Sequence, residues 1–244
     1  MNQALSVADS NRDTLTRDSD QRRPIRSFVR RTGRMTEAQH GAVARYAPQF
    51  MLDYAPRPLD LAQAFGRAAP CALEIGFGNG EQLLASAASE PERNWLGIEV
   101  HLPGVGFLLH RAGPAGLSNL RVIAHDAVEV LRDMLAPSVL DEVRILFPDP
   151  WPKARHHKRR LIQPEFLALL AARLRVGGRL HLATDWEPYA QTMVDALAAT
   201  PGLSHRAAAS GFVERPRWRV QSRFERRGVG LGHGVFDLCA ERVA

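Results

Sequence analysis

Three carboxylates stand at the ends of three successive apolar runs in this 244-residue chain. Glu74 lies near the end of CALEIG, Glu99 lies in WLGIEV, and Asp126 follows VIAH. Short, continuous apolar runs are typical of strands buried on both faces of a parallel sheet. The carboxyl ends of such strands meet at one edge, where ligands bind, so we expect the three acids to face a common ligand. An acid in the place of Glu99 typically accepts hydrogen bonds from ribose hydroxyls, while Asp126 can also cap a following helix.

A glycine-rich loop at residues 76–80 (GFGNG) follows the first of these runs. Its glycines permit a tight turn and a close approach to a ligand, although a plain strand-to-helix turn would use the same residues. The dinucleotide-binding spacing G-x-G-x-x-G fails, because Glu81 stands where the third glycine belongs. A ligand with a ribose, an adenine and a positive centre suits the acids better than a pyrophosphate does. The pattern therefore predicts S-adenosylmethionine, not NAD, bound by Glu74, Gly76, Gly78, Glu99 and Asp126.

The fourth apolar run leads into Pro148-Asp149-Pro150-Trp151-Pro152-Lys153. Proline fixes the backbone angle φ, so three prolines hold one carboxylate and one large aromatic ring in a rigid loop. Such a loop at the end of a strand is suited to holding a nucleic-acid base near a reacting group. A proline-rich loop that only ends the strand is the plainer alternative.

From residue 71 onward, apolar runs alternate with helical periodicity. This alternation predicts an α/β fold with a mostly parallel sheet and helices on both faces. The expected strands span 71–76, 94–99, 119–124, 142–147, 178–183 and 234–240, and the expected helices 80–89, 102–111, 126–135, 164–174 and 187–198. Before them, Thr36 and Gln39 have the spacing of a capping box for a short helix, and Pro48, Pro56 and Pro58 are expected to break the chain there.

Taken together, these motifs resemble the bacterial tRNA (guanine-N7-)-methyltransferases. The resemblance covers residues 25–238 and rests on IRSFVRRTGR, LEIGFGNG, GIEVH, FPDPWPK with the RH and KRR that follow, TDW and SRFERRG. It implies a class I methyltransferase (Rossmann-like) fold, with a seven-stranded sheet whose last strand is antiparallel. It also implies transfer of a methyl group from S-adenosylmethionine to N7 of a guanosine in tRNA, in this family the variable-loop guanosine.

The resemblance assigns roles to residues by their motif positions. Asp149 joins the cofactor-binding acids and lies at the reacting centre as the catalytic residue. The implied substrate-binding residues are Lys153, Asp185, Ser222, Arg223, Phe224 and Glu225, and the implied tRNA-contacting residues are Arg155, His156, His157, Lys158, Arg159 and Arg160. The chain departs from the family pattern at Ala154 and His157, where Lys and Asn are common, and at Ser222-Arg223, where Thr-Lys is usual. These departures predict a slightly altered tRNA affinity.

Basic segments favour a polyanionic partner, as does the formal net charge of +6. Residues 153–160 (KARHHKRR) contain no acid and follow the proline loop directly, which favours phosphate contacts over a merely solvated loop. The C-terminal ERPRWRVQSRFERRG interleaves arginines with Trp218 and Phe224. These rings are expected to stack on an extruded base, with a core-facing position as the alternative. The segment at 25–34 adds a third basic patch.

Composition limits the remaining possibilities. Residues 1–24 are polar and are expected to form a disordered tail, followed by a basic lead-in at 25–60 and a methyltransferase domain at 61–244. Cys71 and Cys239 lie in apolar runs and are expected in the core, not in a disulfide or a metal site. The absence of a signal core or a membrane-spanning run predicts a cytoplasmic protein. The sequence leaves open whether the protein is a monomer or a homodimer.

The implied reaction needs no strong general base, because guanine N7 has an in-plane lone pair and no proton to lose. Asp149 is expected to stabilise the positive charge that develops on the base, while Asp185 and Glu225 accept the N1 and N2 hydrogens. An exocyclic-amine methyltransferase would favour an Asp/Asn-Pro-Pro-aromatic loop, a different order from the one present. A catalytically silent RNA-binding protein would not need the acids, and an NAD-dependent oxidoreductase is disfavoured by the glycine spacing.

Overall fold

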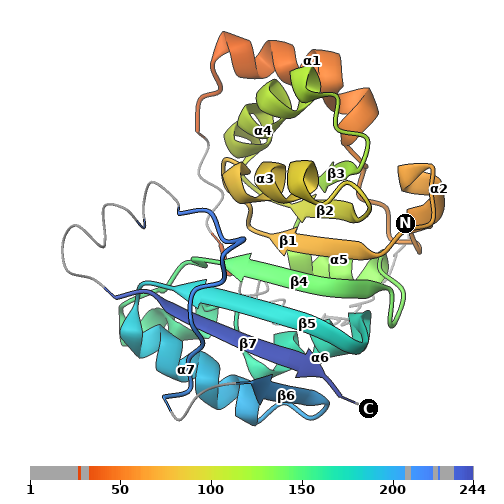
Figure 1. The fold of residues 1–244 in the computed structure, drawn as a ribbon. Helices are drawn as coiled ribbons and strands as arrows, with labels where there is room; N and C mark the ends of the chain where they lie inside the picture. Colours follow the sequence, from red (N-terminus) through yellow and green to blue (C-terminus); the bar gives the residue numbers. More distant parts are fainter. Residues whose placement is uncertain (1–26, 29–32, 207–209, 222–224, 226–233, 244) are drawn as a thin grey trace, which may run out of the picture.

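A computed structural model of the chain describes residues 27–28, 33–206, 210–221, 225 and 234–243. Within these residues, seven strands form one sheet in the order β3-β2-β1-β4-β5-β7-β6 (Figure 1). The strands are β1 (Cys71–Ile75), β2 (Asn94–Ile98), β3 (Leu120–Ile123), β4 (Leu140–Leu146), β5 (Leu174–Thr184), β6 (Leu203–Arg206) and β7 (Phe236–Arg242).

Neighbouring strands from β3 to β5 run parallel, and β7 pairs antiparallel with both β5 and β6. The predicted sheet, with its antiparallel last strand, is confirmed. Strand order reverses between β1 and β4, and such a reversal opens a crevice beyond the carboxyl ends of the strands. The register brings these ends level, because Ile75 lies opposite both Ile98 of β2 and Ile145 of β4.

Helices cover both faces of this sheet (Figure 1). One face carries α1 (Glu37–Phe50), α3 (Glu81–Ser89) and α4 (Leu102–Ala115), and the other α5 (Ala127–Asp133), α6 (Pro164–Arg173) and α7 (Glu187–Ala198). The short α2 (Leu61–Phe65) precedes β1, and a 3-10 helix, η1 (Ala154–Arg159), follows β4. In the described part of the chain, no helix combines the length and the apolar character needed to cross a membrane.

Alternate residues of the strands serve two separate cores, because side chains of a strand point to opposite faces in turn. Leu73 and Ile75 pack with α5, α6 and α7, whereas Ala72 packs with α3 and α4. Cys71 is buried in β1, Cys239 is half-buried in β7, and both are free thiols. The two cores fix the sheet from both sides, so the loops at its carboxyl edge are carried on a rigid frame.

The lead-in folds onto this frame through α1. The predicted capping box is present: the Thr36 hydroxyl accepts from the Gln39 N–H at 3.3 Å, and the Gln39 side chain accepts from the Thr36 N–H at 2.8 Å. The prediction that Pro48 breaks the chain is wrong, because the helix continues to Phe50. Phe50 is fully buried against the sheet, and this burial offsets the hydrogen bond that a proline removes from a helix.

Candidate active site

A cavity of about 380 Å³ lies at the carboxyl ends of β1, β2 and β4. Its volume is in the range of pockets for small molecules and cofactors. The three aligned isoleucines Ile75, Ile98 and Ile145 form an apolar part of its wall. Four predicted site residues join them around the cavity: Gly76, Glu99, Asp126 and Asp149. The structure therefore brings most of the predicted cofactor and reaction residues to one place.

Glu99 shapes the loops on both sides of the cavity. One carboxylate oxygen accepts from the Gly78 N–H at 2.8 Å, and the other from the N–H groups of Val100 and His101 at 2.7 and 2.9 Å. A carboxylate has about four lone-pair sites, so three backbone contacts leave capacity for a ligand hydroxyl. The glycine loop is held just as closely from α4, since a Cβ on Gly104 would lie 2.2 Å from the Gly78 carbonyl oxygen.

Asp126 fulfils the helix-capping role considered from the sequence and also faces the cavity. Its Oδ1 accepts from the Val128 N–H at 2.9 Å at the start of α5. The neighbouring His125 also lines the cavity, and its ring stacks on Tyr54 with centroids 3.7 Å apart. The acid is thus fixed in position by the helix that it caps.

Glu74 precedes Ile75 in β1 and is not among the residues that line the cavity. Its side chain is buried, and its Oε2 has no hydrogen-bond partner among the described residues. Burial raises the pKa of Glu74 to about 8; the guanidinium of Arg144 opposes this shift, and the carboxylate of Glu99 adds to it. A buried acid in this state is stabilised in its ionised form by a nearby cation. The acids and the apolar wall therefore fit a cofactor that combines a ribose, an adenine and a positive centre.

The proline loop is held in an unusual backbone conformation. Phe147 and Trp151 adopt positive φ angles of 53° and 44°, a conformation that costs a non-glycine residue roughly 1–3 kcal/mol. Contacts on both sides fix it: the Phe147 N–H donates to the Ala183 carbonyl at 2.8 Å, and the Trp151 indole donates to the Ser27 carbonyl at 3.0 Å. Between these two points, Asp149 is exposed at the cavity edge.

The basic run after this loop forms η1, which sequence reasoning did not predict as a helix. Lys153, Arg155 and Lys158 are exposed, and His156 is half-buried. The guanidinium of Arg159 lies over the Trp151 ring at 4.0 Å. Desolvation, together with the surrounding cations, lowers the pKa of His156. Positive side chains therefore gather beside the cavity.

Arg160 requires a correction to the expected tRNA-contacting set. Its side chain is buried, donating to the Pro150 carbonyl at 2.9 Å and to the Thr192 hydroxyl at 3.0 Å. Its guanidinium also lies 4.7 Å from the centre of the Tyr189 ring. Because these contacts occupy the group inside the protein, Arg160 holds the proline loop in place and does not belong to the exposed basic surface.

The C-terminal segment also differs from expectation. Trp218 packs on Arg144, whose guanidinium lies 3.6 Å from the ring centre, and meets His181 edge to face. This is the core-facing alternative, not a free stacking platform. Glu225 is buried and accepts twice from Arg219, at 2.8 and 2.9 Å. Ser222, Arg223 and Phe224 lie outside the described residues, and Asp185 is half-buried directly after β5.

Sequence reasoning missed the buried polar network beneath these segments. Arg219 also donates to Asp237 at 2.9 Å, and His181 contacts Asp237 at 2.8 Å. The signal available was a charged residue inside an apolar strand, as at Arg144 in DEVRIL. Among the residues that the structure describes, no three His, Cys, Asp or Glu side chains are grouped closely enough to hold a metal ion.

Known proteins similar to this chain are methyltransferases. A family model described as "Putative methyltransferase" matches residues 68–238. A tRNA (guanine-N(7)-)-methyltransferase of Xanthomonas euvesicatoria pv. vesicatoria is 57% identical over 221 residues, which are 91% of this chain and 65% of that protein. One of Aeromonas hydrophila subsp. hydrophila is 50% identical over 231 residues, which are 95% of this chain and 98% of that protein.

Solved structures show the same fold at lower sequence identity. A 16S rRNA (adenine(1408)-N(1))-methyltransferase from Catenulisporales acidiphilia, crystallised with its cosubstrate SAM, matches with a TM-score of 0.52. It is 23% identical, and the match covers 75% of this chain and 90% of that one. The expected class I methyltransferase fold is thus confirmed.

Proposed function

The chain belongs to the tRNA (guanine-N(7)-)-methyltransferase family, and we propose that it transfers the methyl group of S-adenosylmethionine to N7 of a guanosine in tRNA. We propose that the methyl acceptor is the guanosine in the variable loop. Because the substrate is tRNA, we also propose that the protein is located in the cytoplasm. The observation that carries the proposal is the placement of Asp149, which lines the cavity and is followed in the chain by the exposed cations of residues 153–158. The proposed cofactor cavity and the proposed tRNA-binding surface therefore adjoin at the Asp149 carboxylate.

Three acids divide the recognition of the cofactor, which supplies an electrophilic methyl group on a sulfonium centre. Glu99 would accept a ribose hydroxyl with its remaining lone pair, and its three backbone contacts orient it for this. Asp126, which caps the start of α5 and lines the cavity, would hold the adenine. Glu74, whose pKa of about 8 keeps it largely protonated at neutral pH, would ionise when a positive ligand binds nearby and would then supply negative charge.

Asp149 acts on the methyl acceptor by electrostatics. Guanine N7 attacks through its lone pair without losing a proton, so no general base is needed. The rigid proline loop holds the carboxylate where positive charge develops on the base, and such preorganised charge favours the transition state. Asp185, at the end of β5, recognises the N1 and N2 hydrogens. Glu225 accepts two hydrogen bonds from Arg219, and this buried pair stabilises the C-terminal segment.

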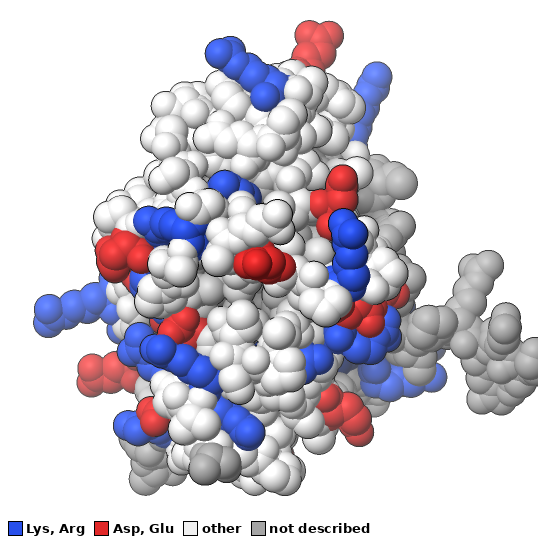
Figure 2. All heavy atoms as spheres, turned by 90° about the vertical axis from the view of Figure 1, so that its right-hand side faces the viewer, with Lys and Arg blue, Asp and Glu red and all other residues white. Residues whose placement is uncertain are grey.

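The basic run at 153–159 holds the tRNA by its phosphates. Its exposed cations are Lys153, Arg155 and Lys158, and the half-buried His156, His157 and Arg159 lie beside them. Figure 2 shows the opposite face, toward which the amino ends of the parallel strands point, and there positive and negative side chains are interspersed. That mixture offers a polyanion no continuous positive surface, whereas the run at 153–159 contains no acid.

Mapping the methylated nucleotide tests this proposal. Unmodified tRNA is incubated with the purified protein and S-adenosylmethionine, and the product is analysed by nuclease digestion and mass spectrometry. We expect N7-methylguanosine at one position in the variable loop. Methylation of an exocyclic amine, or binding of tRNA without any methyl transfer, would show that one of the rival activities is correct.

A further inference from the structure

Gln82 connects the glycine loop to the C-terminal segment. It is the second residue of α3, two residues after Gly80, and its side chain is buried. Its Oε1 accepts from the Val220 N–H at 2.6 Å, and its Nε2 donates to the Trp218 carbonyl at 3.3 Å. One amide thus satisfies a donor and an acceptor of the same backbone segment, which lies well over a hundred residues away in sequence.

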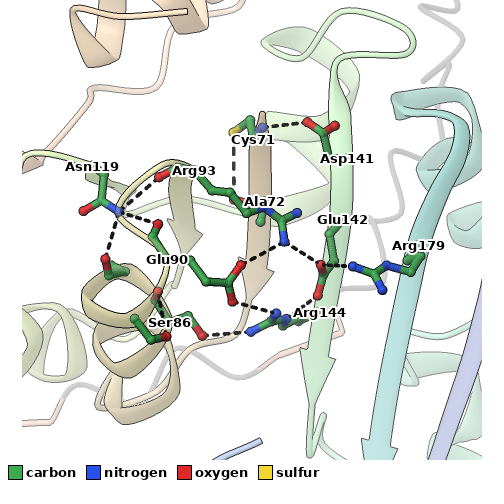
Figure 3. A network of polar contacts seen from close by, with 12 residues as sticks. Cys71, Ala72, Ser86, Glu90, Arg93, Asn119, Asp141, Glu142, Arg144 and Arg179 are labelled. Atoms are coloured by element: carbon green, nitrogen blue, oxygen red, sulfur yellow. Dashed lines mark hydrogen bonds and ion pairs between the residues drawn. The ribbon is translucent and has the colours of Figure 1, made fainter. Parts of the chain in front are cut away.

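A second set of contacts holds Gln82 itself. Its Nε2 also donates to the Ser86 hydroxyl at 2.8 Å, and this hydroxyl accepts from Arg144 of β4 at 2.8 Å. Figure 3 shows Arg144 reaching from β4 toward Ser86 while it pairs with Glu142. Arg144 also lies against the Trp218 ring. Gln82, Ser86 and Arg144 together form what we call the α3 seat, on which residues 218–220 rest.

The seated segment leads to the residues proposed to recognise guanine. Residue 219, in its middle, anchors Glu225 through two hydrogen bonds. The segment that the family resemblance assigns to the substrate, residues 222–225, begins two residues after Val220. The α3 seat and the Arg219–Glu225 pair therefore fix residues 218–220 and Glu225, which border residues 222–224 in the chain.

We infer that Gln82 is a positioning residue that couples the cofactor loop, through α3, to residues 218–220 and, through Arg219, to Glu225. The inference rests on the proposed function. The glycine loop and α3 are continuous, and the loop amide of Gly78 is bound to Glu99 at the cavity. A cofactor bound against this loop would restrain the start of α3 further, and Gln82 would transmit that restraint to residues 218–220. Binding of cofactor and binding of tRNA then assist each other, as linkage requires.

The variant Gln82→Met tests this coupling, because Met keeps the length and apolar bulk but cannot hydrogen-bond the backbone. Two quantities are measured: steady-state kinetics with tRNA, and the affinity for S-adenosylhomocysteine by calorimetry, with and without tRNA. We expect kcat/KM for tRNA to fall about tenfold, the scale of leaving partly buried backbone groups unpaired. Affinity for S-adenosylhomocysteine should stay within about twofold in the free protein, while the gain in affinity caused by tRNA should disappear.

Two further variants separate positioning from general stability. Gln191→Met makes the same change at an exposed site of α7 and should behave as wild type. Gln82→Glu keeps the acceptor for Val220 but removes the donor to Trp218, so it should recover part of the kcat/KM that Gln82→Met forfeits.

Three outcomes would overturn the inference. In the first, Gln82→Met retains the wild-type KM for tRNA and the wild-type coupling. In the second, both Gln82 variants lose S-adenosylhomocysteine affinity in the free protein as much as they lose tRNA activity, which means a purely structural role. The third is a Gln82→Glu variant with no recovery over Gln82→Met. A wild-type protein that does not methylate tRNA would instead overturn the proposed function.

Discussion

Two groups of arginines in this molecule differ in burial and in their carboxylate partners. The run at 153–159 lies on the surface beside the cavity, and the segment contains no acid. Arg144 and Arg219 are buried, and each meets carboxylates: Glu142 for the first, Glu225 and Asp237 for the second. Buried cations with carboxylate partners hold segments of the fold together. Exposed cations in a segment without acids remain available to a polyanion.

The largest expected effect is on stability, at a buried arginine. Arg219→Met should lower the free energy of unfolding by about 3–5 kcal/mol, because it removes the buried cation that pairs with both Glu225 and Asp237. Arg206→Met is the matched control, since the Arg206–Glu241 pair is largely exposed and such pairs contribute at most about 1 kcal/mol. Urea denaturation measures both variants. Equal effects would refute the distinction between buried and exposed arginines.

Asp149 is an exposed charge and should affect the rate instead of the fold. Asp149→Asn keeps the size of the side chain but removes the charge, so the chemical step should slow by roughly 10²–10³-fold. Affinity for the cofactor should fall less than the rate, because the interaction strengthens toward the transition state. Single-turnover kinetics and calorimetry separate the two quantities. A variant that loses cofactor affinity but keeps the single-turnover rate would assign Asp149 to binding alone.

Glu74 is a buried acid whose Oε2 has no hydrogen-bond partner among the described residues. It should make the free energy of unfolding depend on pH. Its pKa is about 8 in the folded protein, against an ordinary value of 4.5. Between these values the unfolded chain ionises first, so the free energy of unfolding falls as pH rises, by up to about 1.4 kcal/mol per pH unit. Glu74→Gln should flatten this decline. Urea denaturation across the mildly acidic to mildly alkaline range measures it, and an unchanged decline would exclude Glu74 as its source.

The smallest effect concerns the basic run. Replacing Arg155, Lys158 and Arg159 by Gln should raise KM for tRNA and reduce the salt dependence of tRNA binding, by about one unit of slope for every phosphate that these side chains neutralise. Cofactor binding and stability should stay near the wild-type values. Arg175→Gln, at an exposed arginine paired with Asp141 at the start of β5, is the control. An unchanged slope would mean that this run is only a solvated surface.

The sequence predicted those features that depend on local patterns. Apolar runs of strand length, separated by helical periodicity, were sufficient for the parallel sheet, and the glycine loop with acids at strand ends located the cavity. Weak local patterns were not recognised. The strand β6 is short and mostly polar (LSHR), and α2 has only five residues. The strand β5 begins at Leu174, earlier than expected, within a stretch that contains two glycines.

Contacts between residues far apart in the chain could not be predicted from the sequence, for a different reason. Arg159 and Arg160 are adjacent, yet one lies over Trp151 at the surface and the other is buried on Tyr189. Which of two neighbouring arginines turns inward depends on α7, which sequence alone does not place. The sequence likewise could not predict the packing of Trp218 on Arg144, because folding alone brings these two segments together.

The pH dependence of the wild-type chemical step tests the central claim most directly, namely that charge placement and not proton removal drives the reaction. It is measured as the single-turnover rate at saturating S-adenosylmethionine and tRNA, from neutral to mildly alkaline pH. We predict a nearly flat profile, since N7 has no proton to lose. A rate that rises with pH with a logarithmic slope near one would indicate general-base catalysis and would contradict the electrostatic role of Asp149.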